Sequence, residues 1–521
     1  MTEAYDLDRI AREAPPHRKL SALRPGLSAV EALLGIGGDA RISISKPGGV
    51  NRYGCPTSPS PDVVAFGSST ASIVSEAGFS AAEVLRERLL ASADRFARAR
   101  TYREELDRLR DELKGLCGLD DMPDLGVLFA ASGTDLHLIV GELAAKGRPL
   151  VSIGVESTET GSGVALALAG RHFSSRTALG RNVDPGEPIG TDASSRRVVP
   201  IDCREPDGAL RLQTSIGRRL EAATCSAILG GARVLLVVTD VSKTGLISPS
   251  IETVLAMRNR WPNDVEVLID ACQFRLSPES LRAYLDAGCM VAVTGSKFLT
   301  GPSFSAALFA PGPLMERLPA RLAAGRLATY CSRAEWPGPW AVGAPLPETE
   351  NFGLLMRWEA ALCELRAFRA VAPEQSSAFL GAFSRAVQAR LTADPAFEPL
   401  PIRPPDRRPL AAEPGWDAIP TIFPFMLRDP RPQRSILSRD ETDQVYRTLR
   451  DGPDHVHLGQ PVACGARHGA PISALRLCAS ARLVVEAANA GPDGHDRIIR
   501  RAMDALDATA VAIHEVANAG G

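Results

Sequence analysis

Strand-like and helix-like segments alternate regularly between about residues 125 and 310 of this sequence. Short, almost wholly apolar runs are separated by longer segments with helical spacing of apolar residues, including those near 250–260 and 277–287. Apolar runs of this kind are typical of strands that are buried on both faces, with the intervening helices covering those faces. The pattern therefore predicts an α/β fold with a mostly parallel sheet between helices. The predicted strands are LGVLFA, RPLVSIG, RVLLVVTD, VEVLIDA, CMVAVTG and SFSAALFA.

A different pattern begins after about residue 350, and we interpret it as a smaller α+β domain. At 521 residues the chain is too long for one ordinary hydrophobic core, so more than one domain is expected. We predict an N-terminal arm over residues 1–60, a large α/β domain over 61–330 and a small α+β C-terminal domain over 331–521. The elements expected in the small domain are helices at 351–372 and 374–392, a strand TIFPFML, a helix near 440–450, strands near 455–462 and 472–478, and a final helix near 495–517.

A long helix is also predicted directly after the arm. Ser80 and Glu83 have the spacing of a capping box, in which each side chain bonds a free backbone N–H of the first helical turn. The apolar residues expected to form the buried face of this helix are Val84, Leu85, Leu89 and Phe96.

Composition and charge narrow the functional classes. The formal net charge is −2, which gives no electrostatic reason to expect binding to nucleic acid or to a membrane. The longest apolar runs are too short to span a bilayer, and the charged N-terminus has no signal-peptide pattern. The ten cysteines contain no C-x-x-C pair, which favours reduced thiols in the cytoplasm over a disulfide framework or a metal site.

Three of the predicted strands end in unusual polar residues. LGVLFA leads into Ser132-Gly133-Thr134, VEVLI into Asp270 and Gln273, and MVAV into Thr294-Gly295-Ser296-Lys297. Ligands of α/β sheets bind beyond the carboxyl ends of the strands, where these groups are expected to meet. A lysine here is informative, because the chain has only six lysines against 53 arginines. A phosphate-binding helix start, a buried carboxylate and a nucleophilic lysine are the groups that pyridoxal 5′-phosphate (PLP) requires.

The order S-G-T-D, D-x-x-Q and S-K-x-x-x-G-P resembles fold-type I PLP-dependent enzymes, and most of all the aminotransferase class V and cysteine desulfurase group. The resemblance extends over roughly residues 60–480. It implies that Lys297 forms the Schiff base with PLP and that Asp270 pairs with the pyridinium nitrogen. It further implies a homodimer whose small-molecule substrate is an amino acid. The remaining residues that it implies for the cofactor are Ser132, Gly133, Thr134, Thr294 and Ser296 around the phosphate and lysine, Gln273 at the phenolic oxygen, and Thr349 of ETENFG as a phosphate contact from the partner chain.

The reaction follows less directly from the sequence. Arg476, in ISALRLCAS, stands where the resemblance implies an arginine for the substrate α-carboxylate. The family usually places an aromatic ring or histidine over the cofactor after the strand PLVSIG, but the residues there, 155–160, include no ring. His137 is a weak substitute, since its position in the phosphate helix favours a packed helical histidine. We therefore expect transferase or lyase chemistry (elimination or replacement) on an amino acid, in the setting of specialised metabolism.

Several alternatives stay open. Lys243 in DVSKTGL is the rival Schiff-base lysine, although it precedes the acidic strand end, unlike the family order. A cysteine desulfurase needs a mobile thiol, for which Cys464 in the loop GQPVACGARHGAP is the candidate, although an incidental cysteine is favoured. His455-x-His457 lacks an identifiable third metal ligand. Further candidates are a nucleotide-binding Rossmann oxidoreductase using Gly161-Ser162-Gly163, a catalytically silent protein of the PLP fold, and a substrate pocket built with Ser68, Ser69 and Thr70.

Overall fold

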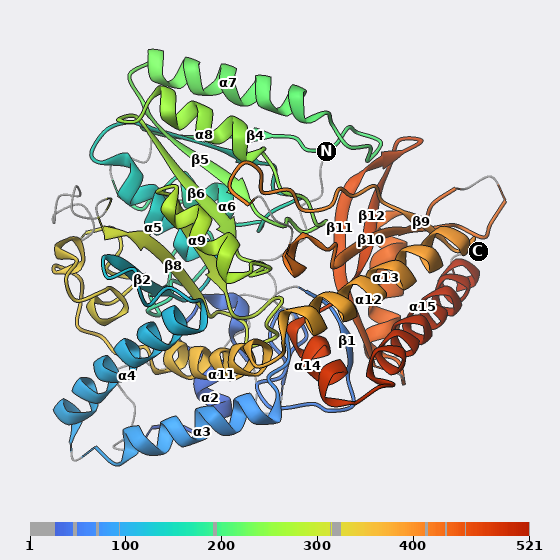
Figure 1. Ribbon diagram of the computed structural model, residues 1–521, viewed down its shortest axis with the longest axis horizontal. Coiled ribbons are helices and arrows are strands. Elements are labelled where there is room, and N and C mark those ends of the chain that lie inside the picture. Colours follow the sequence, from blue (N-terminus) through green and yellow to red (C-terminus); the bar gives the residue numbers. More distant parts are fainter. Residues whose placement is uncertain are drawn as a thin grey trace.

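The computed structural model describes residues 27–44, 49–68, 72–92, 94–190, 195–312, 314, 325–411, 415–432, 435–453 and 455–519. Within these ranges the chain forms two sheets, and Figure 1 shows them side by side with helices around both. The larger sheet has seven strands in the order β2-β8-β7-β6-β5-β3-β4. Its strands are β2 (Leu125–Ala130), β3 (Leu150–Val155), β4 (Arg196–Ile201), β5 (Arg233–Thr239), β6 (Val265–Ala271), β7 (Met290–Thr294) and β8 (Ala306–Pro311).

The larger sheet is mostly parallel, as predicted. β8 is antiparallel to both of its neighbours, β2 and β7, and the other pairings are parallel. The six predicted strands are present, and β4 is an additional edge strand beside β3 that the sequence analysis did not predict.

Alternate residues of the central strands enter two different hydrophobic clusters, because successive side chains of a strand point to opposite faces. In β5, Val234, Leu236 and Val238 join one cluster, whereas Leu235 and Val237 join the other. Both faces are therefore covered, which is why these strands read as continuous apolar runs. The helices that follow or flank these strands are α5 (Gly133–Ala145), α6 (Val164–Leu168), α7 (Gln213–Leu229), α8 (Ile251–Arg260) and α9 (Pro278–Asp286).

The helix predicted from Ser80 differs from the structure, which has two helices there. α3 (Glu76–Leu90) is capped by Ser75, whose side chain accepts from the N–H of Gly78, and Ser80 lies inside it. α4 (Arg95–Leu116) begins separately after Asp94. Of the predicted apolar face, Leu85 and Leu89 are fully buried, but Val84 is 55% and Phe96 85% exposed. The prediction of one continuous face was wrong for two reasons: Val84 lies on the exposed side of α3, and Phe96 belongs to α4, which begins after a break that changes the helix direction.

The smaller sheet joins the two ends of the described chain. Its order is β1-β11-β12-β10-β9, and β1 (Val64–Phe66) is parallel to β11 (Val456–Arg467). The other strands are β9 (Phe397–Pro399), β10 (Ile422–Leu427) and β12 (Ala470–Cys478). β1 therefore pairs with the small sheet although it lies in the range 61–330, and the domain boundaries stay a prediction. The neighbouring helices are α12 (Pro373–Ala393), α13 (Arg439–Asp451), α14 (Ala481–Asn489) and α15 (Gly494–Ala519).

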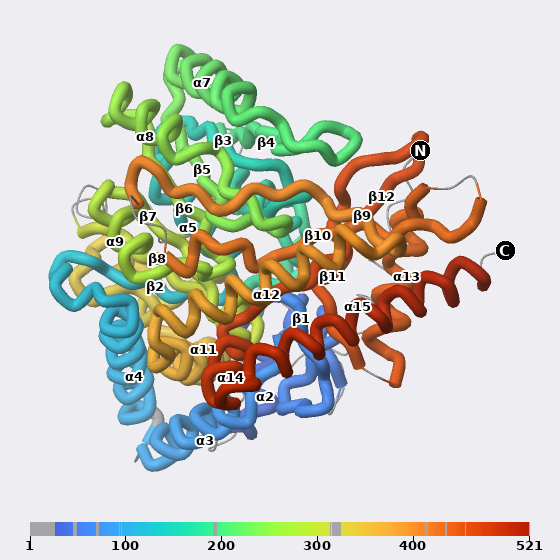
Figure 2. Tube along the Cα trace, turned by 45° about the vertical axis from the view of Figure 1, so that its right-hand side comes forward, coloured from blue at the N-terminus to red at the C-terminus, as the bar shows by residue number. Residues whose placement is uncertain are grey.

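The N-terminal segment packs on the helix that connects the two sheets. Figures 1 and 2 both show α2 (Val30–Leu34) beside α11 (Phe352–Arg369). Arg357 of α11 is fully buried and donates to the backbone carbonyls of Leu34, Ile36 and Gly37. These bonds hold the arm against the body of the protein. Among the described residues no helix is both long and apolar enough to cross a bilayer.

Candidate active site

The three polar strand ends come together at the carboxyl edge of the larger sheet. A Cβ built on Gly133 would lie 2.7 Å from Sγ of Cys272 and 3.6 Å from Cγ2 of Thr294. Thr294 Oγ1 also donates to the backbone carbonyl of Cys272 across 2.6 Å. The ends of β2, β6 and β7 are thus in direct contact, and a side chain larger than that of glycine has no room at position 133.

The first of these ends, after β2, is the start of α5. Ser132 is the N-cap, and its Oγ accepts from the N–H of Asp135 at 3.3 Å. Thr134 is buried in the first turn. The backbone N–H groups of a first helical turn lack intrahelical partners, so they are suited to an anion such as a phosphate.

An arginine from the arm, which the sequence analysis did not identify, also reaches this helix start. Arg41 lies in the 3-10 helix η2 (Ala40–Ile42) and its Nη2 is 3.4 Å from Ser132 Oγ. Its guanidinium lies over the rings of Phe173 and Phe304, 5.9 and 5.0 Å from their centroids. Asp39 accepts two hydrogen bonds from Arg41 Nε. No local sequence signal could have indicated this contact, because 91 residues separate Arg41 from Ser132.

Asp270 is buried at the end of β6 and is held by His137 of α5. His137 Nε2 lies 3.3 Å from Asp270 Oδ2, and His137 Nδ1 is 2.7 Å from the carbonyl oxygen of Gly133. The other carboxylate oxygen of Asp270 accepts from the N–H of Cys272 at 3.2 Å. His137 is thus a buried helical histidine, as favoured from sequence, but it faces the carboxylate.

The electrostatics of this pair favour the charged carboxylate. Burial raises the pKa of Asp270, but the charge and hydrogen bond of His137 and the charge of Lys297 outweigh it, so the pKa lies well below its usual range. Burial lowers the pKa of His137, but Asp270 outweighs that effect, and the net shift is upward. Asp270 therefore stays ionised, with the imidazole of His137 behind it.

Lys297 follows β7 in a tight turn and is half-buried. Its carbonyl accepts from the N–H of Thr300 at 3.1 Å, and the preceding Gly295 accepts from the N–H of Gly301 at 2.8 Å. The neighbouring Ser296 is buried, and its carbonyl accepts from Ser72 Oγ. The structure thus brings Lys297, Asp270, Thr294 and the start of α5 to one place.

Gln273, which is predicted to contact the cofactor, is bonded to a residue of the N-terminal segment. Ser68 Oγ donates to Gln273 Oε1 at 2.7 Å, and Gln273 Nε2 donates to the carbonyl of Ser68 at 3.4 Å. Ser68 was a candidate for the substrate pocket; the structure places it against Gln273, and its role toward a substrate stays a prediction. Ser69 and Thr70 lie outside the described residues.

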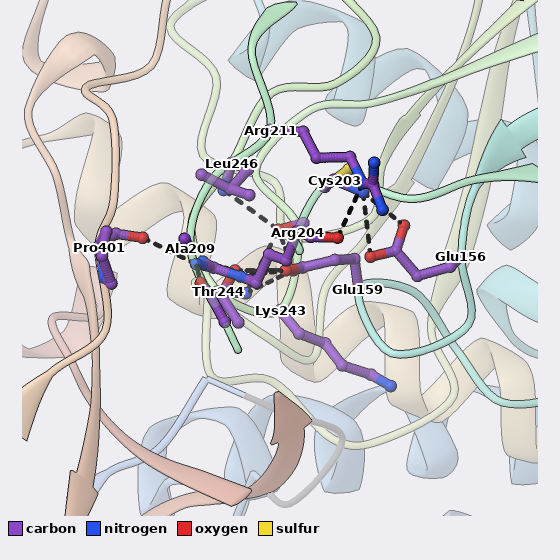
Figure 3. Close-up of polar contacts among 12 residues, drawn as sticks. Glu156, Glu159, Cys203, Arg204, Ala209, Arg211, Lys243, Thr244, Leu246 and Pro401 are labelled. Atoms are coloured by element: carbon purple, nitrogen blue, oxygen red, sulfur yellow. Dashed lines mark hydrogen bonds and ion pairs between the residues drawn. The ribbon is translucent and has the colours of Figure 1, made fainter. Parts of the chain in front are cut away.

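Arg476 and Lys243 lie on the side of the site nearest the small sheet. Arg476 Nη1 donates to the carbonyl of Lys243 at 3.3 Å, and its Nη2 donates to the carbonyl of Gln460 at 2.9 Å. Figure 3 shows Lys243 beside a cluster of polar contacts around Glu159. Lys243 is thus a neighbour of the site, and its charge and that of Lys297 act on each other.

Other candidates have different positions. Thr349 is partly exposed in the segment before α11. Cys464 lies within β11 and is buried, so the expected loop is instead a long hairpin; burial raises the pKa of its thiol to about 11. Gly161-Ser162-Gly163 precedes the five-residue helix α6, and a Cβ on Gly163 would lie 3.1 Å from Thr134. In the described ranges no group of three or more His, Cys, Asp and Glu side chains is arranged to hold a metal ion, at His455 and His457 or elsewhere.

The residues present fit PLP on three observations of this structure. Position 133 has no room for a side chain larger than that of glycine, so the backbone there is open to a ligand. The carboxylate of Asp270 is buried and ionised, and Lys297 is close enough for its charge to act on that carboxylate. The strand order also differs from the 3-2-1-4-5-6 order of a dinucleotide-binding sheet, which disfavours the oxidoreductase alternative.

No family model matches the chain, and no curated protein sequence matches it. Solved structures do match its fold. The cysteine desulfurase CsdA from Escherichia coli has 14% identity, with 86% of this chain and 95% of that chain covered and a TM-score of 0.50. A cystine C-S lyase, C-DES, in complex with cysteine persulfide has 13% identity, with 85% and 97% covered and a TM-score of 0.51. Catharanthus roseus tryptophan decarboxylase in complex with L-tryptophan has 14% identity, with 86% and 83% covered and a TM-score of 0.50.

These likenesses establish the fold. The chain has the fold-type I architecture of PLP-dependent enzymes, so the fold class predicted from its sequence is confirmed.

Proposed function

We propose that this chain is a PLP-dependent enzyme that acts on an amino acid by transferase or lyase chemistry. The observation that carries the proposal is the buried Asp270–His137 pair. The charge of Lys297 acts on Asp270, and His137 lies in the first turns of α5, next to the proposed phosphate site. When bound, PLP withdraws electrons from the substrate Cα through its protonated pyridine nitrogen. The fold supports the proposal, since the solved structures that match it include a desulfurase, a lyase and a decarboxylase.

Each predicted residue has a defined task in this proposal. Lys297 provides the amine that attaches the cofactor, and Asp270 holds a proton at the pyridine nitrogen because its own pKa is low. His137 positions Asp270 through the contact at Nε2. The phosphate binds at the start of α5. Its proposed partners are Ser132, Gly133, Thr134, Thr294 and Ser296, with Gln273 at the phenolic oxygen.

An absorbance spectrum tests the proposal directly. Protein purified with PLP is expected to absorb visible light, and a panel of amino acids is expected to change that spectrum. Protein that binds no PLP under any condition of reconstitution contradicts the proposal. A spectrum that responds to an amino acid identifies the substrate class.

Arg476→Lys is expected to weaken amino-acid binding by roughly tenfold or more, with little change in PLP binding. Lysine keeps the charge but loses the planar pair of N–H groups that meets a carboxylate with two parallel bonds. Spectral titration measures both affinities. Arg467→Lys is a matched control, because Arg467 lies on the same hairpin but pairs with Glu398. Loss of PLP with normal amino-acid affinity contradicts the role given to Arg476.

The desulfurase alternative depends on a mobile thiol, and the surroundings of Cys464 do not favour one. Cys464 packs in a small cluster with Leu400, Met426, Ile436, Ile472 and Ala474. A thiolate is the reactive form, and burial raises the pKa of this thiol.

Cys464→Ala is therefore expected to retain most of the activity and to lose about 1 kcal/mol of stability, since only a small cavity forms. Sulfide release from cysteine and urea unfolding measure the two effects. If the wild type releases sulfide and the variant binds cysteine without releasing any, the desulfurase function replaces the one proposed. Cys363→Ala provides a comparison, because Cys363 is less buried.

We also propose a cytoplasmic homodimer in which Thr349 of each chain contacts the phosphate in the partner. All ten cysteines are free thiols, which is compatible with a reducing compartment. The partly exposed segment that carries Thr349 is available for such a contact.

A further inference from the structure

The loop that follows β5 holds Lys243 in a defined backbone conformation. Ser242 N–H donates to the carbonyl of Leu246 at 2.8 Å, and Gly245 N–H donates to the carbonyl of Ser242 at 3.0 Å. Val241 has a φ of +61°, which is rare for a β-branched residue. Such a conformation persists only where surrounding contacts fix it, and it is often found at functional sites.

Glu159 supplies those contacts. Its side chain is 2% exposed and accepts from Ser242 Oγ at 2.6 Å, from Thr244 Oγ1 at 2.7 Å and from Arg204 Nε at 3.0 Å. The carbonyl of Glu159 also accepts from the N–H of Lys243 at 2.9 Å. Both neighbours of Lys243 are therefore bound to one buried carboxylate, and the lysine lies between them.

The side chain of Lys243 does not join this cluster. Figure 3 shows it extending away from Glu159, and its Nζ donates to the carbonyl of Ser157 at 3.1 Å. The carboxylate of Glu159 is already paired with Arg204. Across the described residues Lys243 forms no ion pair, and neither does Arg476, which is only 3% exposed.

Two cations besides Lys297 thus meet without an ion-pair partner among the described residues; the charge of Glu159 acts on both, but its carboxylate is already paired with Arg204. Burial, the charge of Arg476 and that of Lys297 lower the pKa of Lys243 to about 8. Desolvating unpaired charges is costly, and like charges at close range add to the cost. A ligand with two anionic groups gives Arg476 and Lys243 a counter-charge each. A ligand with a single carboxylate that pairs with Arg476 leaves Lys243 unpaired.

We propose that Lys243 determines substrate specificity by binding a second anionic group, on the side chain of an amino acid whose α-carboxylate is bound by Arg476. The substrate class is therefore an acidic amino acid, with a carboxylate or sulfinate on its side chain. This inference rests on the proposed PLP-dependent function. It concerns which amino acid binds, and it is independent of the bond that is broken.

Equilibrium titration of the PLP-loaded protein tests the inference, with visible absorbance as the readout of binding. L-aspartate, L-glutamate and L-cysteine sulfinate are compared with the neutral isosteres L-asparagine and L-glutamine. At least one acidic amino acid is expected to bind roughly tenfold to a hundredfold more tightly than its isostere, as for one charge-assisted hydrogen bond. Lys243→Met is expected to remove that preference and leave the affinity for the amide unchanged, whereas Lys243→Arg is expected to keep it.

Lys114→Met is the control for loss of a lysine, because Lys114 lies at the end of α4, where its Nζ donates to the carbonyl of Met122. Circular dichroism and PLP content show whether each variant is folded and loaded. A loaded wild type that binds acidic amino acids and amides equally overturns the inference and leaves the proposed function intact. An equal loss for both ligands in Lys243→Met also overturns it, since Lys243 then acts on the shared α-carboxylate. A wild type that binds no PLP overturns the proposed function itself.

Discussion

Lys297→Ala is expected to abolish covalent attachment of PLP and to lower turnover by at least about a thousandfold, the scale seen when a covalent nucleophile is removed. The amine of Lys297 follows β7 and lies within the electrostatic range of Asp270. Of the six lysines in the sequence, Lys297 alone comes after the strand that carries Asp270. The mutation removes a half-buried side chain from a turn that is held by backbone hydrogen bonds, so the fold is expected to persist.

Borohydride reduction followed by peptide mapping measures the attachment. In the wild type the label is expected on the peptide that contains Lys297, and in Lys297→Ala no peptide is labelled. Lys243→Ala is the matched comparison, because Lys243 is the other lysine of the site; its label is expected to stay on Lys297. Label on Lys243 in the wild type reverses the assignment of the two lysines.

The central strands could be predicted from sequence because their burial on both faces leaves a continuous apolar run. β4 could not, because it lies at the edge of the sheet and its sequence, RRVVPI, includes two arginines and a proline. Of these arginines, Arg196 is buried through an ion pair with Glu142 of α5. A partner 54 residues away gives no local signal.

Strands near 455–462 and 472–478 were predicted, but the continuation of β11 to Arg467 and the start of β12 at Ala470 were missed for a different reason. Gly, Pro and Ala residues in GQPVACGARHGAP indicate a loop when they are considered alone. In the structure the pairing shifts register between Gly459 and Val462 and again between Ala463 and Gly465, as β-bulges do. The bulges accommodate these residues within a strand, and Cys464 is buried as a result.

The candidate site was predicted where its residues follow strands, and missed where they come from distant segments. The ends of β2, β6 and β7 must converge in a sheet of this kind, so their polar residues could be named from sequence. Arg41, the Ser68–Gln273 pair and the Glu159–Arg204 pair depend on long-range packing. The position of His137 behind Asp270 required knowledge of how α5 crosses β6.

Asp270→Asn is expected to keep the fold and PLP content but to lower turnover by roughly a hundredfold to ten-thousandfold, the range associated with a group that holds or transfers a proton. Asparagine has nearly the same shape, so it can still accept from the N–H of Cys272. It has no negative charge, and the proton at the pyridine nitrogen loses its counter-charge. Steady-state kinetics measure the loss, and a variant with near-normal turnover contradicts the proposed role of Asp270.

The histidine behind Asp270 provides a second measurement that does not depend on turnover. In the wild type the carboxylate outweighs burial and raises the pKa of His137. In Asp270→Asn the carboxylate that raised this pKa is gone; burial, the largest effect, and the charge of Lys297 lower it, and the hydrogen bond to the Gly133 carbonyl offsets them only in part. A pH titration of the imidazole by NMR is therefore expected to show His137 below its ordinary pKa in the variant and above it in the wild type. His137→Gln separates the roles: the pKa of Asp270 rises when the charge of His137 is lost, but a carboxyl group remains and Lys297 and the N–H of Cys272 still favour its charged form, so turnover is expected to fall less than in Asp270→Asn. An equal loss in both variants means that the pair acts as one unit, and that the charge of Asp270 alone does not suffice.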